Sequence, residues 1–328
     1  MKKFMKTCAV IALVMIILGI ALGIAGSSVA GRSTISQVVE TVTGGRVRVD
    51  FGEGWGIFRK VEFGDNVELD LGGLSGLDVN YSIGDTSMFS RDQNILSGDV
   101  EMYCPGDGIK NLEIQVGGCH LGTKVSKDGS VYLEAKNVRK FQGYVEDDTL
   151  YVKSTMGSGA SFFDGKSEIT LYLPEGYGFQ EAEIDMGAGE MELEWLKAEE
   201  ASLEVGAGRI SLKSVEAREL SAEVGAGQIE LKNMSVGELD VEVGMGEFVA
   251  EGTVRGNADV ECSMGNVEMK LDGRQEDYNY KLEGAMGNIQ LGKESVGGFA
   301  QDRTIDNGAD KTMEIGCSMG NITIRFRD

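Results

Sequence analysis

The stretch Leu203-Glu204-Val205-Gly206-Ala207-Gly208 decides the fold, because the chain repeats it almost unchanged. Apolar and acidic residues alternate as they do on a half-buried β-strand, and two glycines then allow a tight turn. The second turn glycine falls at positions 189, 208, 227, 246 and 265, which is a period of 19 residues. Looser copies follow at 282–287 and 315–320. A fixed period of about 20 residues with strand-like alternation is typical of a solenoid, in which each coil buries its apolar face only against its neighbours.

The composition supports an all-β solenoid. The 328 residues include 48 Gly but only 2 Pro, and Val, Leu, Ile and Met fill the alternating strands. Glycine reaches positive φ without strain, whereas proline removes a backbone donor, so this balance suits tight turns between hydrogen-bonded strands. We therefore expect a parallel β-solenoid with regular coils over residues 181–328. Degenerate coils with longer loops are expected over 61–180, with excursions at 90–108 and 154–165.

The first 31 residues carry a separate signal. Three lysines precede an unbroken apolar run from Cys8 to Ala25. As a helix, these 18 residues would span about 27 Å, close to the thickness of a bilayer core. We expect a single transmembrane helix at 1–31 that anchors the chain in the cell membrane, with a cytoplasmic N-terminus and the rest of the chain outside the cytoplasm. Cleavage after Ala30 as a signal peptide is the alternative, because residues 28–30 have the form that a signal peptidase needs.

Residues 32–60 are expected to form a juxtamembrane connector. Its cluster of Trp55, Phe58, Arg59 and Lys60 suits a membrane interface, where aromatic rings and basic side chains are common. A strand that caps the first coil is the alternative interpretation.

Stacking in register would place equivalent residues of successive coils in columns. Val205, Val224 and Val243 would share one inward column at steps of about 4.8 Å. Asparagines follow the turn in the last three copies and are expected to form a side-chain amide ladder. They are Asn266, Asn288 and Asn321.

The cysteines are expected to be mostly free. Cys262 and Cys317 continue the inward valine column and, counted along the chain, stand two coils apart. Their Cα atoms would then lie about 9 to 10 Å apart, beyond the limit of about 7 Å for a disulfide bond. Cys104 and Cys119 could pair across a loop, and the sequence does not decide whether they do.

An outward column of carboxylates is the main candidate site. Neighbouring carboxylates about 4.8 Å apart repel by roughly 0.9 kcal/mol in water before salt screening. Weak binding of divalent cations would relieve this repulsion, but a solvated face helped by Lys213, Lys232 and Lys270 is the preferred interpretation. No dedicated metal site or cofactor is expected, because the Gly-Gly-x-Gly-x-Asp repeat of calcium solenoids is missing. The column comprises Asp185, Glu204, Glu223, Glu242, Glu261 and Glu283.

Catalytic signals are few, and we predict no enzyme and no catalytic residues. His120 is the single histidine, and Cys119 beside it would point to the opposite face of a strand. The Gly-Ala-Gly turns lack the Lys-Ser/Thr of a phosphate loop. A net charge of −22, from 53 acidic and 31 basic residues, argues against binding nucleic acid.

The strand pattern resembles a known family. Alternating strands at 77–83 and 112–116, the segment Leu171-Tyr172-Leu173-Pro174 and the Gly-Ala-Gly repeats are similar to the bacterial putative-adhesin family of β-strand-repeat proteins, a domain of unknown function. The resemblance covers roughly residues 70–328 and includes the N-terminal anchor. It implies a β-repeat architecture and transfers no catalytic residues. Some members of that family are thought to accompany envelope-stress signalling systems in Gram-positive bacteria.

These observations predict a non-enzymatic, membrane-anchored protein outside the cytoplasm, with an adhesin-like or envelope-scaffolding role. Its partners would be the membrane and an envelope protein or cell-wall polymer. An accessory role in envelope-stress signalling is the second hypothesis. A carbohydrate-active β-helix enzyme is the third, and a cleft lined by loops from residues 85–165 would favour it.

Overall fold

The computed structural model describes residues 47–50, 60–63, 67–70, 90, 93–104, 108–155, 167–284, 286–297 and 301–327. These residues are all-β, apart from one 3-10 turn at Gln275–Asp277. The chain divides into two compact units, Met1–Ser82 and Ile83–Asp328. Among the described residues, no helix has the length and apolar character needed to cross a membrane. The anchor expected at 1–31 lies outside them.

The first unit contains a small antiparallel sheet. Its strands β1 (Val47–Asp50), β2 (Lys60–Phe63) and β3 (Val67–Asp70) pair in sequence order. Part of the stretch expected to be a connector is therefore strand. In the expected interface cluster, Lys60 begins β2, and Trp55, Phe58 and Arg59 lie outside the described residues.

In the second unit, a long strand, a glycine turn and a short strand make one coil. Strand β12 (Leu196–Val205) alternates buried apolar with exposed side chains, and β13 (Arg209–Leu212) continues this alternation after the turn. The alternation breaks once, where Glu199 and Glu200 are both exposed, which marks a bend in the long strand. The same burial pattern recurs in β14 (Val215–Val224). Each coil therefore contributes the same set of inward side chains to a continuous core.

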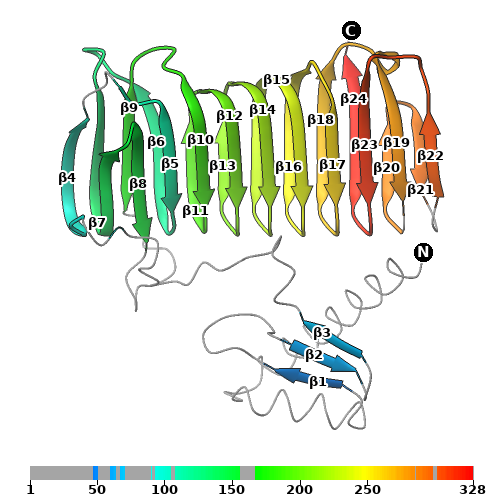
Figure 1. Ribbon diagram of the computed structural model, residues 1–328, viewed down its shortest axis with the longest axis horizontal. Helices are drawn as coiled ribbons and strands as arrows, with labels where there is room; N and C mark the ends of the chain where they lie inside the picture. The colour runs from blue at the N-terminus through cyan, green and yellow to red at the C-terminus, as the bar shows by residue number, and fades with distance from the viewer. Residues whose placement is uncertain are drawn as a thin grey trace. The chain divides into compact units, whose positions relative to one another are not determined.

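The regular coils stack in parallel and in register (Figure 1). They run from β10 (Phe179–Met186) and β11 (Gly189–Leu193) through β15 (Gln228–Val243) and β16 (Glu247–Val254) to β17 (Ala258–Cys262) and β18 (Asn266–Asp272). Val205 is in register with Val224, which is in register with Val243, and all three are buried. The predicted inward column is confirmed.

The repeated glycines have a steric cause. A Cβ atom placed on Gly227 would lie under 3.0 Å from the carbonyl of Gly208 and from Cγ2 of Val205. A Cβ atom placed on Gly246 or Gly265 would approach the previous coil equally closely. Stacked turns in this fold therefore leave no room for a side chain at this position.

At the C-terminal end, the stack departs from sequence order. Strands β23 (Lys311–Cys317) and β24 (Asn321–Arg327) insert between β17/β18 and the earlier coil formed by β19 (Tyr278–Gly284) and β20 (Asn288–Leu291). Strands β21 (Glu294–Gly297) and β22 (Gln301–Ile305) then pair antiparallel with β20 and β19. The expectation of purely parallel coils in sequence order is wrong here, because the outermost coil is covered by its own returning strands.

The N-terminal end uses the same arrangement. The coil of β5 (Asn111–Val116) and β6 (Cys119–Val125) lies between β10/β11 and a later coil of β8 (Thr149–Thr155) and β9 (Glu168–Leu173). Strand β7 (Val131–Glu146) covers that outer coil by antiparallel pairing, and β4 (Leu96–Cys104) pairs antiparallel with β7. Residues 131–134, within the range expected to form degenerate coils, are thus part of a cap, and β4 lies where an excursion at 90–108 was expected. Covering the end coil protects backbone groups that an open edge would expose.

Candidate functional site

The predicted acidic column exists on the outward side of the long strands. Asp185, Glu204, Glu223, Glu242 and Glu261 follow one another in register through five coils. The next residue in the column is Gly316, because β23 is inserted there, and only then comes Glu283. The sixth predicted member is therefore separated from the other five by one coil.

Two further rows of carboxylates run beside this column, and the sequence reasoning missed both. They follow the same period and lie at alternate positions of the long strands, so the signal was present in the sequence. We call the three rows together the acidic face. One additional row is Glu181, Glu200, Glu219 and Glu238. The other is Glu183, Ser202, Ser221, Asp240, Asp259 and Glu314.

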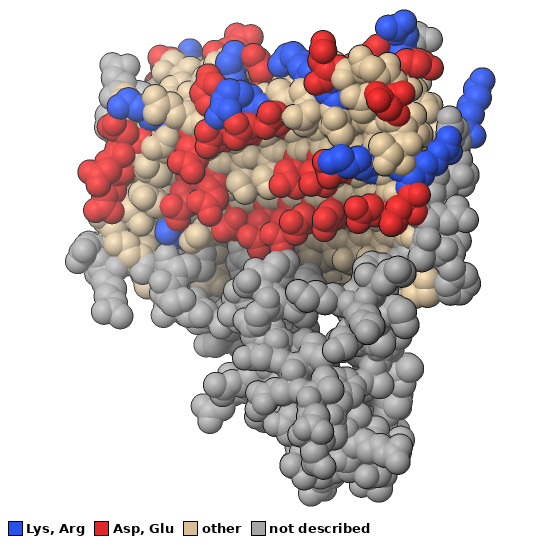
Figure 2. Space-filling model, turned by 45° about the vertical axis from the view of Figure 1, so that its right-hand side comes forward, with Lys and Arg blue, Asp and Glu red and all other residues tan. Residues whose placement is uncertain are grey.

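A shallow groove follows the two additional rows along the stack. It has a volume of about 700 Å³ and is lined by both rows, with small residues such as Ala182, Ala201 and Ala258 between them. Figure 2 shows acidic side chains gathered into bands that run across successive coils. The arrangement presents many carboxylates at a regular spacing instead of converging a few on one point.

Burial and then mutual repulsion raise the pKa of several carboxyl groups of the acidic face. The pKa of Asp185 rises to about 7, first because of burial and then because Glu204, Glu183 and Glu113 lie nearby. Burial also raises the pKa of Glu223, with contributions from both neighbours in its column. The pKa values of Asp259 and Glu261 rise for the same two reasons. Burial is the largest cause of each shift, and the remaining causes are mainly neighbouring carboxylates.

Cations reach the acidic face mainly at its margins. Lys153 pairs with Glu113 at 2.8 Å at the N-terminal end, and Lys281 pairs with Glu314 at the C-terminal end. Arg218 pairs with Glu200 at 2.5 Å near the bend of the long strands. Among the residues that the structure describes, no lysine or arginine forms an ion pair with Glu223, Glu242 or Glu261 of the acidic column.

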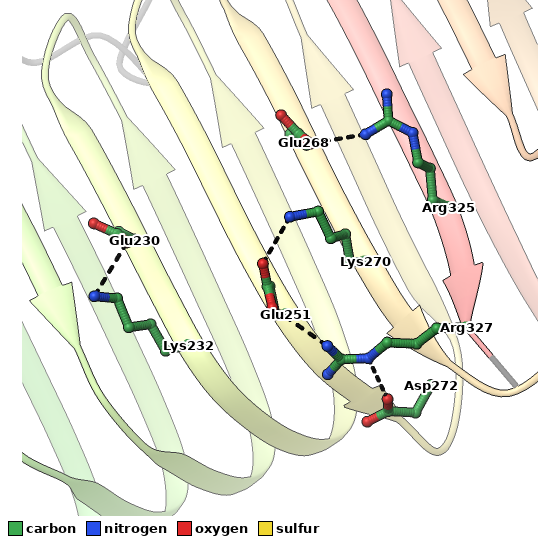
Figure 3. A network of polar contacts seen from close by, with 8 residues as sticks. All are labelled: Glu230, Lys232, Glu251, Glu268, Lys270, Asp272, Arg325 and Arg327. Carbon is green, nitrogen blue, oxygen red and sulfur yellow. Dashed lines mark hydrogen bonds and ion pairs between the residues drawn. The ribbon is translucent and has the colours of Figure 1, made fainter.

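The outward side of the short strands has the opposite character, and we call it the paired face. Glu251 contacts Lys270 at 2.8 Å and Arg327 at 3.3 Å, and Arg327 also contacts Asp272 at 2.6 Å (Figure 3). Hydrogen bonds from these cations lower the pKa of Glu251 and of Asp272. Arg325 pairs with Glu268 at 2.9 Å in the same network.

The three lysines expected to relieve the acidic column lie on this paired face instead. Lys213 pairs with Glu194 at 2.6 Å, Lys232 with Glu230 at 3.5 Å, and Lys270 with Glu251. The expectation fails because strand alternation separates inward from outward residues but does not tell which outward face a residue occupies.

The predicted asparagine ladder is confirmed, in a different order. The side-chain amide of Asn288 donates to Oδ1 of Asn321 at 2.8 Å, and that of Asn321 donates to Oδ1 of Asn266 at 3.2 Å. The ladder follows the inserted coil, so its order is 266, 321, 288.

A comparison with protein families identifies the family of this chain. The profile of the Toastrack DUF4097 family matches residues 109–325, from just before β5 to within β24. The chain belongs to the Toastrack DUF4097 family. No curated protein matches it.

Solved structures similar to this Toastrack chain share little sequence with it. A putative adhesin from Bacteroides fragilis is 13% identical, with 69% of this chain and 96% of that chain covered and a TM-score of 0.40. A putative lipid binding protein from Parabacteroides distasonis is 16% identical, with 70% and 97% covered and a TM-score of 0.39. A putative cell adhesion protein from Clostridium sporogenes is 14% identical, with 71% and 100% covered and a TM-score of 0.27.

The one residue pair of the Toastrack domain considered for catalysis is not assembled as a nucleophile and base. Cys119 is a buried free thiol, and burial raises its pKa to about 12. His120 points outward from the same strand and lies 3.8 Å from Glu190 of β11. It borders a hollow of about 750 Å³ that Trp195 and Lys124 also line. A thiol that is buried on the opposite face cannot reach this hollow.

A bound metal would need a different arrangement of ligands. Within the part of the Toastrack chain that the structure describes, no group of three or more His, Cys, Asp or Glu side chains is arranged to hold a metal ion. The solvated face stays the prediction for the acidic column, and weak cation binding stays its alternative.

Proposed function

We propose that this Toastrack protein is a non-enzymatic, membrane-anchored β-solenoid outside the cytoplasm, and that it acts as an adhesin-like or scaffolding protein of the cell envelope. The acidic face would be its working surface. The partner would carry clustered amino groups, as a basic protein segment or an amino-bearing wall polymer does.

The observation that supports this proposal is the difference between the two faces. The chain has enough lysine and arginine to neutralise carboxylates on the paired face, where ion pairs at 2.6 to 3.3 Å hold Arg327 against Asp272 and Glu251. On the acidic face, burial raises the pKa of Asp185 and Glu223, and repulsion from neighbouring carboxylates raises it further. Carrying this uncompensated charge destabilises the fold, and a cationic partner would relieve it.

The geometry suits a long partner better than a small substrate. The carboxylate rows repeat with each coil at about 4.8 Å, and the groove between them is open along the stack. A row of fixed charges attracts an extended polycation over its whole length, and salt weakens such attraction.

The test compares two variants of the full-length protein in detergent. The first replaces Glu204, Glu223 and Glu242 with Gln on the acidic face. The matched control replaces Glu190, Glu192 and Glu247 with Gln on the outward side of short strands, which changes the net charge by the same amount. Retention on immobilised poly-L-lysine and on purified cell envelopes is measured against salt concentration. We expect the first variant to elute at clearly lower salt and the control to behave like the parent protein.

Equal losses in both variants would show that total charge, and not the acidic face, determines binding. Binding to envelopes alone would point to a feature other than clustered amines. Anchoring is tested separately: an apolar run of 18 residues at 8–25 should keep the protein in membranes through alkaline washing. Mature protein that begins at Gly31 in the medium would show a cleaved signal peptide.

A further inference from the structure

Cys262 and Cys317 occupy the same position in neighbouring coils. Strands β17 and β23 pair in parallel with these two residues opposite each other, and the backbone amide of Ser318 donates to the carbonyl of Cys262 at 2.9 Å. Neighbouring strands lie about 4.8 Å apart. This spacing falls within the Cα separation of about 4.4 to 6.8 Å that disulfide bonds span.

The two sulfur atoms are also close. Both are free thiols, and their mutual interaction together with burial raises the pKa of Cys317. Sγ of Cys262 leans toward the inserted coil, where a Cβ atom on Gly320 would lie under 3.0 Å from it. On the far side of Cys317 the column continues with Gly284, and Sγ of Cys317 leans toward the turn of that outer coil, where a Cβ atom on Gly287 would lie under 3.0 Å from it. Bond formation therefore requires Cys317 to change its rotamer toward Cys262.

We propose that Cys262 and Cys317 form a disulfide bond that ties the inserted C-terminal coil to the body of the stack. The oxidant is a low-molecular-weight disulfide such as oxidised glutathione. One cysteine thiolate attacks the oxidant and forms a mixed disulfide, which releases one reduced thiol. The second cysteine loses its proton and displaces the other thiol. The two cysteines lose two electrons and two protons in total, and the oxidant becomes two thiols.

The bond would close a loop that contains most of the C-terminal end of the stack. Residues 262 and 317 are separated by 55 positions, and the loop between them contains β18 to β22, including the outer coil and both of its covering strands. A link between the ends of a loop restricts the unfolded chain and so favours the folded state. Both thiols are only 2% exposed, so oxidation should be fastest during folding, before the C-terminal coil inserts.

The experiment uses the full-length protein refolded from denaturant with oxidised glutathione or with a reductant. Free thiols are alkylated under denaturing conditions, and the digested protein is analysed by mass spectrometry. We expect one cross-linked peptide pair that joins Cys262 to Cys317, and an alkylated Cys119. Before alkylation, the mass of the intact oxidised chain should be lower than that of the reduced chain by two hydrogen atoms. The melting temperature should be roughly 5 to 15 °C higher in the oxidised form.

The matched control is Cys262→Val, because valine fills the same column at positions 205, 224 and 243. This variant should fold, and oxidant should no longer change its melting temperature. Full alkylation of both cysteines after oxidative refolding of the parent protein would overturn the proposal. A bond from either cysteine to a different partner, or an equal response to oxidant in the valine variant, would also overturn it.

Discussion

Cys262 lies directly opposite Cys317, although a complete coil from β19 to β20 intervenes between them in the sequence. The chain places its last coil inside the stack and its second-last coil outside. The same order occurs at the other end, where the coil of β5 and β6 lies inside the later coil of β8 and β9. The first and last coils of the array are thus paired on both sides, and antiparallel strands cover the outer coils. Burying both sides of these coils protects the array from fraying.

The inserted coil should stabilise both of its neighbours. Ile315 is buried and in register with Val260 on one side and Leu282 on the other. Ile315→Ala should therefore cost about 2 to 5 kcal/mol of unfolding free energy. Hydrogen exchange should speed up in both flanking coils, 258–272 and 278–291. Ile95→Ala, at a side chain that is 46% exposed, is the control and should change little. Faster exchange in one flanking coil only would contradict the inserted order.

The sequence predicts the middle of the stack well and its ends poorly, and particular residues show why. Val205, Val224 and Val243 repeat without drift, so only one register fits them. The copies at 282–287 and 315–320 carry the same turn motif, and either could stack on the coil at 260–265. What decides the order is the returning strands β21 and β22, which cover β20 and β19 and carry no repeat signal.

The candidate site could also be predicted only in part from the sequence. The column from Asp185 to Glu261 is predictable because it stands next to the glycine turn. The row from Glu181 to Glu238 has the same period and could also have been found, whereas the row that includes Asp240 and Asp259 is interrupted by two serines and is harder to recognise. The placement of Lys213 on the paired face depends on the three-dimensional path of the coil, which alternation alone does not give.

Replacing the turn glycine should destabilise the protein where the coils approach most closely. Gly227→Ala would bring Cβ against the backbone of Gly208 and the side chain of Val205, so we expect a loss of about 1 to 3 kcal/mol in denaturant unfolding. Gly122→Ala is the matched control, since a Cβ there meets the carbonyl of Glu192 at an ordinary 3.5 Å. It should be neutral or slightly stabilising. Similar losses in both variants would argue against the steric explanation.

Stability should fall as the pH rises through the titration of Asp185. Its pKa is about 7 in the folded protein and 3.8 in the reference state, so the folded state binds the proton more tightly. The stabilisation that proton binding by Asp185 contributes to the folded state is present below pH 4 and is lost as the pH approaches 7. Asp185→Asn should flatten the dependence between pH 4 and 7 and stabilise the protein at pH 8 by at most about 4 kcal/mol.

Asp272→Asn is the control for this pH dependence, because the pKa of Asp272 is shifted in the opposite direction to that of Asp185. The hydrogen bond from Arg327 lowers the pKa of Asp272, so its contribution is present at neutral pH and is lost as the pH falls. Removing it should lower stability at pH 7 and leave the slope between pH 4 and 7 in place. Urea unfolding at a series of pH values measures both variants. An unchanged slope in Asp185→Asn would refute the assignment.

Removing charge from the centre of the acidic column should stabilise the protein in low salt. Replacing Glu204, Glu223 and Glu242 with Gln removes four neighbouring carboxylate contacts in the column from Asp185 to Glu261. Each contact repels by roughly 0.9 kcal/mol in water, so a gain of about 1 to 3 kcal/mol is expected at low ionic strength. The gain should shrink in 0.5 M salt, because screening acts over a shorter distance there. Melting curves with and without millimolar calcium complete the test. We expect little calcium response from the parent protein, and a large calcium shift that the triple variant loses would instead establish the column as a cation site.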